Sequence, residues 1–435
     1  MQDKLIEKIK PYIKNYNSYL VGGYMRDFLL GKISIDRDIA IECDGLRNLV
    51  LKIADELNGS FVELDNENEI YRVVFDKEYI DFAKIINSLE DDIDRRDFTI
   101  NSIMYDINND KIIDKNNGKK DFENKIIKTH KISNLSDDYL RMLRAIRFQS
   151  YLGFEIDDEI KDFIKLNAEK LNSVAKERIN QELIKIFEGE FLIKALFEMD
   201  ELNLLEVIFP VFKEIKKIPK NSHHHLDLFH HLIETTKNIR INKPELKIAA
   251  LLHDLAKPDC WTIEEETKRH RFIGHDEIGS KKVIPILKDL KFSNKQIEYI
   301  SKMIKYHIYP SALMCSQDKT EKSIIRFIRK INEDTIDLIE LARADRISAQ
   351  GEAITKEIVE NNLQQLEILK EKYIQISPKL KEMPKLIDGN EIMKILNIPP
   401  SSKLKEIIEE IKERQIEGTI QTKDDAIEFV LTFKN

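Results

Sequence analysis

The run IDRDIAIE places two aspartates, Asp36 and Asp38, two positions apart in a segment typical of a β-strand. Because side chains of a strand alternate between its two faces, both carboxylates are expected on the same face. Such oxygens are ligands that Mg²⁺ prefers, and an ion held there can bind a nucleoside triphosphate and promote attack on its α-phosphate. Acidic residues fill 78 of 435 positions, so a solvated strand edge is the alternative interpretation.

The adjacent glycines Gly22 and Gly23 lie between the strand-like residues YLV and a helical pattern that contains Arg26. Glycines at such a junction let backbone N–H groups approach a polyphosphate, and the helix N-terminus and Arg26 add positive potential. A chance pair is expected at this glycine content, so the pair alone gives weak support to a phosphate site.

A third charged segment, DIDRRDFTIN, contains Arg95 and Arg96, whose guanidinium groups can hold a ribose or a triphosphate. Asp97 is expected to orient these arginines, and the amide of Asn101 is expected to reach the sugar. The alternative is a solvated run of charges.

Farther along the chain, Asp138, Arg141, Arg144 and Arg147 recur every third residue, which on a helix places them on one face. Cytosine and adenine both present an exocyclic amine beside a ring-nitrogen acceptor, so an aspartate can accept from the amine while an arginine donates to the ring. Uracil and guanine present the reverse pattern. The face therefore predicts a selector for C and A; arginines paired only with acidic residues of the same segment are the alternative.

Nine of the ten histidines fall between residues 223 and 307. Imidazoles and carboxylates together suit a divalent transition metal such as Ni²⁺, Mn²⁺ or Co²⁺, and six groups suffice for two ions. The expected ligands are His231, His253, Asp254, His275, His307 and Asp345. His223, His224 and His225 are interpreted as surface residues.

These groups must be positioned by two kinds of structure. Five β-rich runs, YLVGG, DIAIE, RVVFD, YIDFA and KIID, are separated by turn residues between 18 and 130, and apolar residues recur at helical intervals from about 137 onward. With 42% hydrophobic residues and only 13 glycines and 11 prolines, the chain is neither disordered nor fibrous. We predict an α/β head followed by a mainly helical neck, body and tail.

The net charge and the cysteine content limit the binding partners and the cell compartment that fit this sequence. A net charge of −8 argues against a surface covered with phosphate-binding groups, although a local basic groove is compatible with it. The dispersed Cys43, Cys260 and Cys315 suit neither a disulfide framework nor a CxxC metal site and indicate a reducing cytoplasm. Neither a signal peptide nor a membrane span is expected, because no long apolar stretch is present.

Taken in order, the motifs GGxxRD, DxD, RRDFTxN, D-Y-L-R-x-L-R-x-x-R-F and ERxxxE resemble those of the class II tRNA nucleotidyltransferase and poly(A) polymerase family. The last motif contains Glu177, Arg178 and Glu182. The resemblance implies a polymerase-β-like nucleotidyltransferase head in which Asp36 and Asp38 hold Mg²⁺.

The same resemblance implies roles for the other residues. Asp138 and Arg141 read the incoming base, and the next two arginines of that face support Arg141 or reach phosphates. CTP and ATP are the implied nucleotides, and tRNA is the implied acceptor. The triphosphate is held by Gly23, Arg26, Arg95 and Arg96.

One segment departs from the family pattern. Only residues 82–94 separate Asp81 from Arg95, whereas members that add the full CCA end usually carry a longer flexible loop there. The segment resembles members that add only CC, so addition of the terminal A stays open. Asp81 is a candidate for the group that accepts the proton of the RNA 3′-hydroxyl, and an ordinary strand-end residue is the alternative.

The pattern H…HD…D resembles the HD phosphohydrolase superfamily, which implies a two-metal site that hydrolyses 2′,3′-cyclic phosphates or phosphomonoesters. The predicted domains are a nucleotidyltransferase head (1–130), a helical neck and RNA-binding body (131–220), an HD domain (221–350) and a helical tail (351–435). In that tail, RNA contact by Lys403 or Lys405 is a guess.

The chain is therefore predicted to add CCA, or only its CC part, to tRNA without a template. A poly(A) polymerase, or an HD phosphohydrolase whose head only binds RNA, is the alternative.

Overall fold

The computed structural model describes residues 3–32, 34–220, 226–266, 270–317, 319–349, 354–382, 384–416 and 418–434. The chain divides into two compact units, Met1–Pro210 and Val211–Asn435, so the division falls within the segment predicted as the neck. His223, His224 and His225 lie outside the described residues.

The first unit begins with a seven-stranded sheet in the order β3-β4-β5-β2-β1-β6-β7. Strands β2 and β5 are parallel, and the other neighbours are antiparallel. Strands β3 and β6 lie outside the predicted runs, because SFVELD is largely exposed and lacks a clear apolar alternation, and MYD is very short. The strands are β1 (Ser18–Val21), β2 (Asp36–Ile41), β3 (Ser60–Asp65), β4 (Ile70–Phe75), β5 (Glu78–Lys84), β6 (Met104–Asp106) and β7 (Lys111–Ile113).

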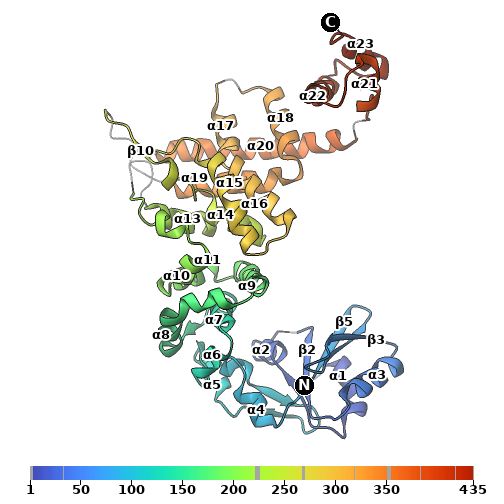
Figure 1. Ribbon diagram of the computed structural model, residues 1–435, viewed down its shortest axis with the longest axis vertical. Helices are drawn as coiled ribbons and strands as arrows, with labels where there is room; N and C mark the ends of the chain where they lie inside the picture. Colours follow the sequence, from blue (N-terminus) through green and yellow to red (C-terminus); the bar gives the residue numbers. More distant parts are fainter. Residues whose placement is uncertain are drawn as a thin grey trace. The chain divides into compact units, whose positions relative to one another are not determined.

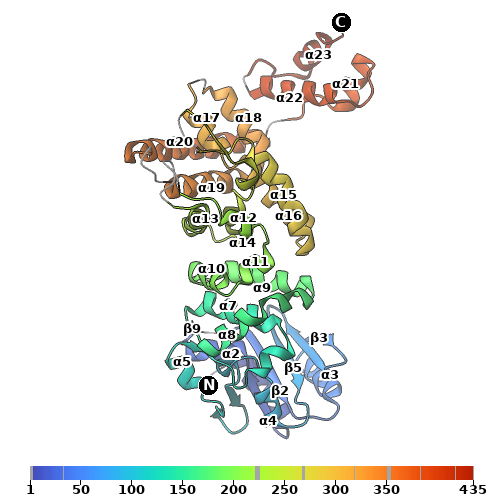
Figure 2. The same ribbon diagram turned by 60° about the vertical axis from the view of Figure 1, so that its left-hand side comes forward.

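Helices α1 (Lys4–Ile13) and α3 (Leu46–Glu56) pack their apolar stripes against one face of this sheet (Figures 1 and 2). The Asp3 carboxylate caps α1 by accepting from the backbone N–H groups of the next turn at 2.9 and 3.2 Å. Its other oxygen accepts from Nε of Arg37 at 2.8 Å. Because Arg37 lies in β2 between the two aspartates of the DxD run, this contact ties their strand to the core.

The opposite face of the sheet carries a second, smaller apolar cluster. Tyr19, Val21 and Met104 from the sheet pack there with residues that include Ile93 of α4 (Leu89–Asp94). Val21 lies directly opposite Asp38 in the antiparallel register. The carboxylates of β2 therefore lie at the border of this cluster.

The rest of the first unit is helical, and α7 packs against both α9 and α10. Two short parallel strands, β8 (Ile126–Ile127) and β9 (Glu155–Ile156), join the end of the head to the helices. The helices are α2 (Gly23–Leu29), α5 (Gly118–Glu123), α6 (Ser133–Asp137), α7 (Leu140–Leu152), α8 (Asp158–Asn167), α9 (Lys176–Glu188), α10 (Leu192–Glu201) and α11 (Leu204–Ile208), with 3₁₀ turns at Thr99–Asn101 and Ala168–Ser173.

The second unit is also mainly helical. Its last three helices have an apolar core of their own, which includes Ile392, Ile407 and Ile411. Its helices are α12 (Phe212–Ile215), α13 (Leu228–Lys237), α14 (Pro244–Leu252), α15 (His275–Asp289), α16 (Asn294–Tyr306), α17 (Tyr309–Cys315), α18 (Glu321–Ile331), α19 (Thr335–Ser348), α20 (Lys356–Glu382), α21 (Gly389–Leu396), α22 (Ser402–Ile416) and α23 (Lys423–Leu431). A hairpin of β10 (Thr262–Ile263) and β11 (His270–Arg271) and 3₁₀ turns at Pro258–Cys260 and Asn332–Asp334 complete the unit.

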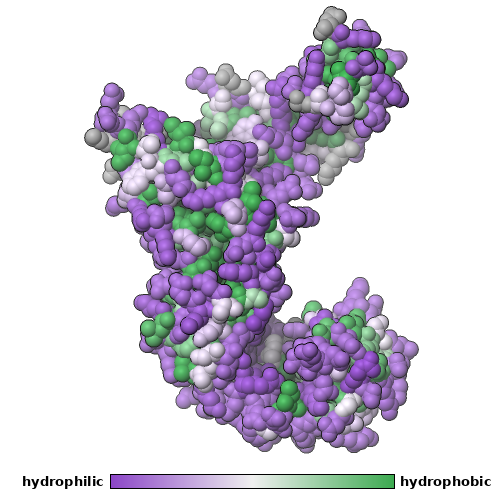
Figure 3. Space-filling model, viewed as in Figure 1, coloured by the Kyte–Doolittle hydropathy of each residue, from purple (hydrophilic) through white to green (hydrophobic). Residues whose placement is uncertain are grey.

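Among the described residues, every helix is too short or too polar to cross a bilayer. Hydrophilic side chains cover most of the surface that is visible in Figure 3, and apolar patches lie between them.

A buried carboxylate in the second unit gives a stability prediction. Glu340 of α19 accepts hydrogen bonds from the Arg240 and Arg343 guanidinium groups at 2.7 to 3.2 Å and from the Arg240 backbone N–H at 2.7 Å. Burial opposes ionisation, but the bonds from Arg343 and Arg240 outweigh it and lower the pKa of Glu340 to about 2. A lowered pKa in the folded state stabilises the protein above the ordinary value near 4.5.

We expect Glu340→Gln to lower the free energy of unfolding by about 2 kcal/mol at pH 7, because each pKa unit corresponds to about 1.4 kcal/mol and the exposed Arg240 reduces the full effect. The difference from the wild type should shrink as the pH falls from 4.5 toward 2. Urea denaturation of the full chain at pH 7 and pH 3 measures it, with the exposed Glu360→Gln as control. Equal destabilisation at both pH values contradicts a lowered pKa of Glu340 as the source of the stability.

Candidate active site

The glycine pair forms the turn between β1 and α2. Gly22 has a backbone φ of 66°, and a Cβ added there would lie 3.0 Å from Oδ2 of Asp38. A Cβ on Gly23 would lie 3.3 Å from Oδ2 of Asp36. The turn can therefore run directly beside both carboxylates only because it lacks side chains.

We expect Gly22→Ala to lower kcat/KM for a nucleotide substrate at least about tenfold, because the methyl group forces the Asp38 carboxylate to move. Gly31→Ala is the matched control: Gly31 has φ 69°, and its added Cβ meets no described atom within 4 Å. Both positions have a positive φ, so a side chain adds backbone strain in either variant. An equal loss of kcat/KM in the two variants would show that contact with Asp38 is irrelevant.

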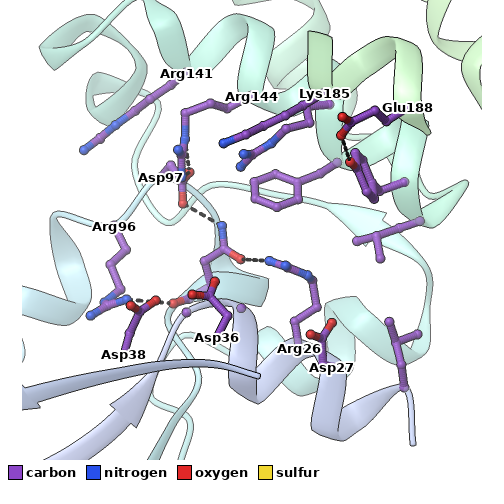
Figure 4. Close-up of a pocket in the computed structure, with 18 of the residues that line it drawn as sticks. Arg26, Asp27, Asp36, Asp38, Arg96, Asp97, Arg141, Arg144, Lys185 and Glu188 are labelled. Carbon is purple, nitrogen blue, oxygen red and sulfur yellow. Dashed lines mark hydrogen bonds and ion pairs between the residues drawn. The ribbon is translucent and has the colours of Figure 1, made fainter. Parts of the chain in front are cut away.

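The two aspartates project from β2 toward the same side, as the two-residue spacing predicts (Figure 4). Burial, followed by the negative charges of Asp36 and Asp81, raises the pKa of Asp38 to about 7, although Arg96 and Arg72 oppose the shift. Carboxylates that repel each other in this way are suited to a divalent cation, whose charge removes the repulsion. The donor set therefore fits Mg²⁺, which would polarise a bound phosphate.

The arginines of the DIDRRDFTIN segment are oriented by a residue other than the predicted one. The carboxylate of Asp92, which is almost fully buried, accepts from Arg95 Nε at 3.0 Å and from Arg96 Nη2 at 2.8 Å. Asp97, to which this role was assigned, lies instead among Arg144 and Asn101. The prediction failed because a charge at i+4 across one helical turn reaches the arginines better than the adjacent residue does.

Asp97 and Asn101 link the head to the neck (Figure 4). Asp97 accepts from Nε of Arg144 at 2.7 Å and from the Asn101 amide at 2.9 Å, and the Asn101 oxygen accepts from Arg26 at 3.2 Å. Burial opposes ionisation of Asp97, but Arg144 and these hydrogen bonds outweigh it and lower its pKa. The amide expected to reach a sugar is thus occupied in aligning two arginines.

The structure of the neck differs from the predicted helical face in one residue. Asp138 lies before α7 with an extended backbone, so only Arg141, Arg144 and Arg147 share a face of that helix. Asp138 accepts from the backbone N–H of Leu140 at 3.1 Å. This bond of the Asp138 side chain to a nearby backbone N–H competes with the helix and leaves Asp138 just before the N-cap residue, Tyr139.

Helix α9 positions the residues at the start and in the middle of α7. Arg178 holds Asp138 with two bonds of 2.6 and 3.3 Å, and the buried Glu182 lies 3.2 Å from Nε of Arg147. Burial opposes ionisation of Asp138, but the Arg178 bonds outweigh it and lower the pKa. Arg141 donates to two backbone carbonyls at 2.8 Å. Arg144 and Arg147 therefore pair with acids of other segments, contrary to the alternative of pairing within their own segment.

Most of these side chains, although not Asp92 or Glu182, line one cavity of about 780 Å³, which lies within the first unit and is large enough for a nucleotide. Figure 4 shows the arginines of α7 opposite the carboxylates of β2. Every residue predicted for the head and neck site lines it: Asp36, Asp38, Gly23, Arg26, Arg95, Arg96, Asp138, Arg141, Arg144 and Arg147.

Asp81 lies in the middle of β5, opposite Asp38 in the parallel register, rather than at a strand end. Both of its oxygens accept from Arg72, at 2.6 and 2.8 Å. Both oxygens of this carboxylate are therefore engaged by Arg72 instead of facing an RNA hydroxyl.

The second unit gathers the predicted histidines and aspartates into one buried cluster. Asp254 lies at its centre, and two overlapping groups of ligand atoms fall within 4.8 Å of one another. The groups are His231, His253 and Asp345, and His253, Asp254 and His307. His275 also contacts Asp254, with Nε2 at 3.0 Å from Oδ1. The six ligands come from or next to α13, α14, α15, α16 and α19.

The hydrogen bonds of three of these histidines fit a metal centre. Nδ1 of His253, His275 and His307 lies 2.8, 2.6 and 2.6 Å from the carbonyl three residues earlier in the chain. With Nδ1 bonded to the carbonyl, Nε2 is the ring atom that faces the centre and would bind a metal in the neutral imidazole. Four imidazoles and two carboxylates that converge in this way are a donor set that fits a divalent transition metal.

Lys257, one turn after the HD pair, is a cluster member that the sequence analysis missed. Its Nζ lies 2.5 Å from Oδ2 of Asp254. Burial opposes ionisation of Asp254, but the charges of His253 and Lys257 outweigh it and hold the pKa of this carboxyl well below its usual range. The i, i+3 spacing in HDLAK was the available signal.

The head geometry defines a class of protein: a carboxylate pair beside a glycine turn, facing arginines across a nucleotide-sized cavity, belongs to an enzyme that transfers nucleotides from triphosphates. Comparisons with known proteins identify the family. The Poly A polymerase head domain matches residues 18–128, the RNA- and SrmB-binding site of polymerase A matches 153–216, and tRNA nucleotidyltransferase domain 2 matches 271–430.

The chain is 28% identical to the A-adding tRNA nucleotidyltransferase of Deinococcus radiodurans, over 94% of each chain. It is 26% identical to the CC-adding tRNA nucleotidyltransferase of Thermus thermophilus, over 98% of this chain and 95% of the other. The Bacillus stearothermophilus CCA-adding enzyme in complex with CTP shares the fold with a TM-score of 0.65, at 21% identity over 98% and 95% of the two chains.

The chain belongs to the tRNA nucleotidyltransferase and poly(A) polymerase family. It is a nucleotidyltransferase, and the predicted fold class, an α/β head followed by a helical body, is confirmed.

Proposed function

We propose that this protein adds nucleotides of the CCA terminus to the 3′ end of tRNA from CTP and ATP, without a nucleic-acid template. The cavity shared by β2 and α7 supports this function most directly, because it combines a metal-binding carboxylate pair with a base-sized space bounded by protein donors and acceptors. The 3′-oxygen of the RNA bonds to the α-phosphorus, the bond to the bridging oxygen breaks, pyrophosphate leaves, and the hydroxyl proton passes to water.

Asp36 and Asp38 hold Mg²⁺, which neutralises charge on the reacting phosphate. The backbone of the glycine turn, Arg26 and Arg96 hold the triphosphate. Asp138, fixed by Arg178, accepts from the exocyclic amine of C or A, and Arg141 donates to the ring nitrogen. Because Arg178 and two backbone carbonyls hold this pair in place, uracil and guanine leave a donor or an acceptor unpaired, which disfavours their binding.

We further propose that addition stops after CC. After β5 ends at Lys84, only residues 85–88 precede α4, which begins at Leu89. Residues 82–94 are thus a strand end, a short connection and a helix, with no room for the longer loop expected of members that add the full CCA end.

Incubation of tRNA that lacks its CCA end with Mg²⁺ and each labelled nucleotide tests both statements. Two added C residues are expected. Addition of CCA overturns only the limit to CC, and an A-tract that ignores CTP indicates a poly(A) polymerase. No addition, either to this tRNA or to one that ends in CC, overturns the transferase function on tRNA.

A second activity is favoured by the buried cluster around Asp254. We propose that it holds two transition-metal ions and hydrolyses 2′,3′-cyclic phosphate or phosphomonoester ends. A cavity of about 190 Å³ opens onto Asp254, His275, His307 and Asp345, and Lys257 and Arg346 line it as cations that can bind a phosphate. Turnover of cyclic nucleotides with Ni²⁺, Mn²⁺ or Co²⁺, lost in His253→Ala, is expected. Absence of turnover with all three metals refutes the activity.

A further inference from the structure

The sheet face that carries the carboxylate pair continues onto the neighbouring strands. Asp36 lies opposite Tyr79 of β5, and Asp38 lies opposite Asp81. Arg72 of β4 lies in turn opposite Asp81. Because residues in register point to the same face of a sheet, Tyr79 and Arg72 share the face of the two metal-binding aspartates.

Tyr79 and Arg72 lie against each other on this face and are held by the two aspartates. The Arg72 guanidinium carbon lies 4.0 Å from the centroid of the Tyr79 ring. The guanidinium donates two hydrogen bonds, of 2.6 and 2.8 Å, to the Asp81 carboxylate. The Tyr79 hydroxyl donates to Oδ1 of Asp36 at 3.2 Å. Because Asp81 neutralises the charge of Arg72, the surface presents an aromatic ring and a guanidinium group to a partner, rather than an unpaired cation.

This surface lies beyond the nucleotide cavity, and Tyr79 and Arg72 are both partly exposed. Neither Tyr79 nor Arg72 lines the cavity, whose border on this side is formed by Asp36 and Asp38. On β3, Val62 lies opposite Arg72 and is 39% exposed, and Leu64 is 46% exposed. The other face of these strands is buried against α3.

The sheet order determines what can approach from this side. The glycine turn follows β1 on one side of β2, and β5 lies on the other; in Figures 1 and 2, α2 and β3 lie on opposite sides of β2. In phosphoryl transfer, the attacking and leaving oxygens lie roughly in line across the phosphorus. With the triphosphate on the glycine side, the attacking 3′-oxygen must come from the β5 side.

We propose that Tyr79 and Arg72 form the platform on which the terminal base of the RNA acceptor stacks, next to the carboxylates. Aromatic rings and guanidinium planes are the usual partners of unpaired RNA bases, and stacking tolerates any base. That tolerance suits an acceptor end whose last nucleotide changes as the chain grows. The inference rests on the proposed transfer to tRNA and adds two positioning residues for its second substrate.

Four variants test the platform by steady-state kinetics on tRNA that lacks its CCA end. Tyr79→Ala should raise KM for tRNA about tenfold and leave KM for CTP within twofold, because one stacking contact is lost. Tyr79→Phe keeps the ring and should restore KM for tRNA. Arg72→Lys keeps the charge beside Asp81 but removes the plane, and should raise KM for tRNA severalfold.

Arg47→Lys is the matched control for Arg72→Lys. Arg47 also lies over an aromatic ring, 5.5 Å from the centroid of Phe61, and donates to Glu63 at 2.7 Å, but it belongs to α3 on the other side of the sheet. No change in KM for tRNA is expected. A Tyr79→Ala variant with unchanged KM for tRNA, or with a raised KM for CTP instead, overturns the platform. A wild-type protein that adds nothing to tRNA overturns the proposed function instead.

Photo-crosslinking gives a readout that does not depend on turnover. A tRNA that ends in 4-thiouridine should crosslink to the peptide that spans residues 70–84, and Tyr79→Ala should reduce the yield. Crosslinks that map only to α7 or α9 contradict the proposal.

Discussion

Asp36→Asn is expected to reduce nucleotide transfer to tRNA by at least about a thousandfold. The asparagine keeps the size of the side chain but loses the charge and one ligand oxygen that Mg²⁺ requires. Stabilisation of charge by a metal ion contributes several kcal/mol to a transition state, and about 4 kcal/mol corresponds to a thousandfold in rate. Single-turnover transfer of CMP from labelled CTP measures the effect.

Asp44→Asn is the control, because the Asp44 side chain is fully exposed in the turn that follows β2 and forms an ion pair with Lys84 at 3.6 Å, away from the carboxylate pair. It should transfer at the wild-type rate. The position of Asp36 at the exposed start of β2 makes misfolding an unsuitable explanation for a loss of activity. A rate for Asp36→Asn within tenfold of the wild type would mean that the carboxylate pair does not hold the catalytic metal.

The sequence predicts best those parts of the site that depend on local geometry. The alternation of a strand places Asp36 and Asp38 on one face, and the helical repeat aligns Arg141 with Arg144. In both cases the rule acts within a single element, so no knowledge of tertiary contacts is needed.

Long-range partners were not predictable in the same way. Asp97 meets Arg144 from 47 residues away, and Glu182 meets Arg147 from a different helix. Charged residues are abundant in this chain, so spacing alone does not show which acid pairs with which arginine. The position of Asp138 before α7 depends on its hydrogen bond to a backbone N–H, which competes locally with the helix.

For the histidine cluster, residue type was more informative than spacing in the sequence. Its ligands lie on or beside five helices spread over more than a hundred residues, yet their types alone predicted the set that meets. Buried histidines and aspartates without a shared function are costly, so their concentration in one part of the chain is informative. Lys257 was missed because a lysine is uninformative until its distance to Asp254 is known.

Asp254→Asn is expected to lower the affinity of this cluster for transition metals by at least about a hundredfold, because Asp254 contacts ligands of both groups. Its oxygens lie 3.0 to 3.6 Å from Nε2 of His231, His253, His275 and His307. Loss of a neighbour of a metal ligand typically costs ten- to a hundredfold in affinity, and loss of a ligand costs more. Metal content per chain after dialysis against Ni²⁺, Mn²⁺ or Co²⁺, measured by mass spectrometry, checks the effect.

His230→Gln is the matched control for this variant. His230 lies on the same helix as His231. Its ring is half exposed, and its Nδ1 lies 2.8 Å from Asp227 rather than at the cluster. It should retain the metal content of the wild type. Two ions per chain in the wild type and fewer than one in Asp254→Asn are expected, because the carboxylate is shared and its loss weakens both positions at once. If Asp254→Asn retains both ions, the aspartate interacts with the histidines and Lys257 as a structural ion pair, and the hydrolytic activity proposed for the cluster loses its physical basis.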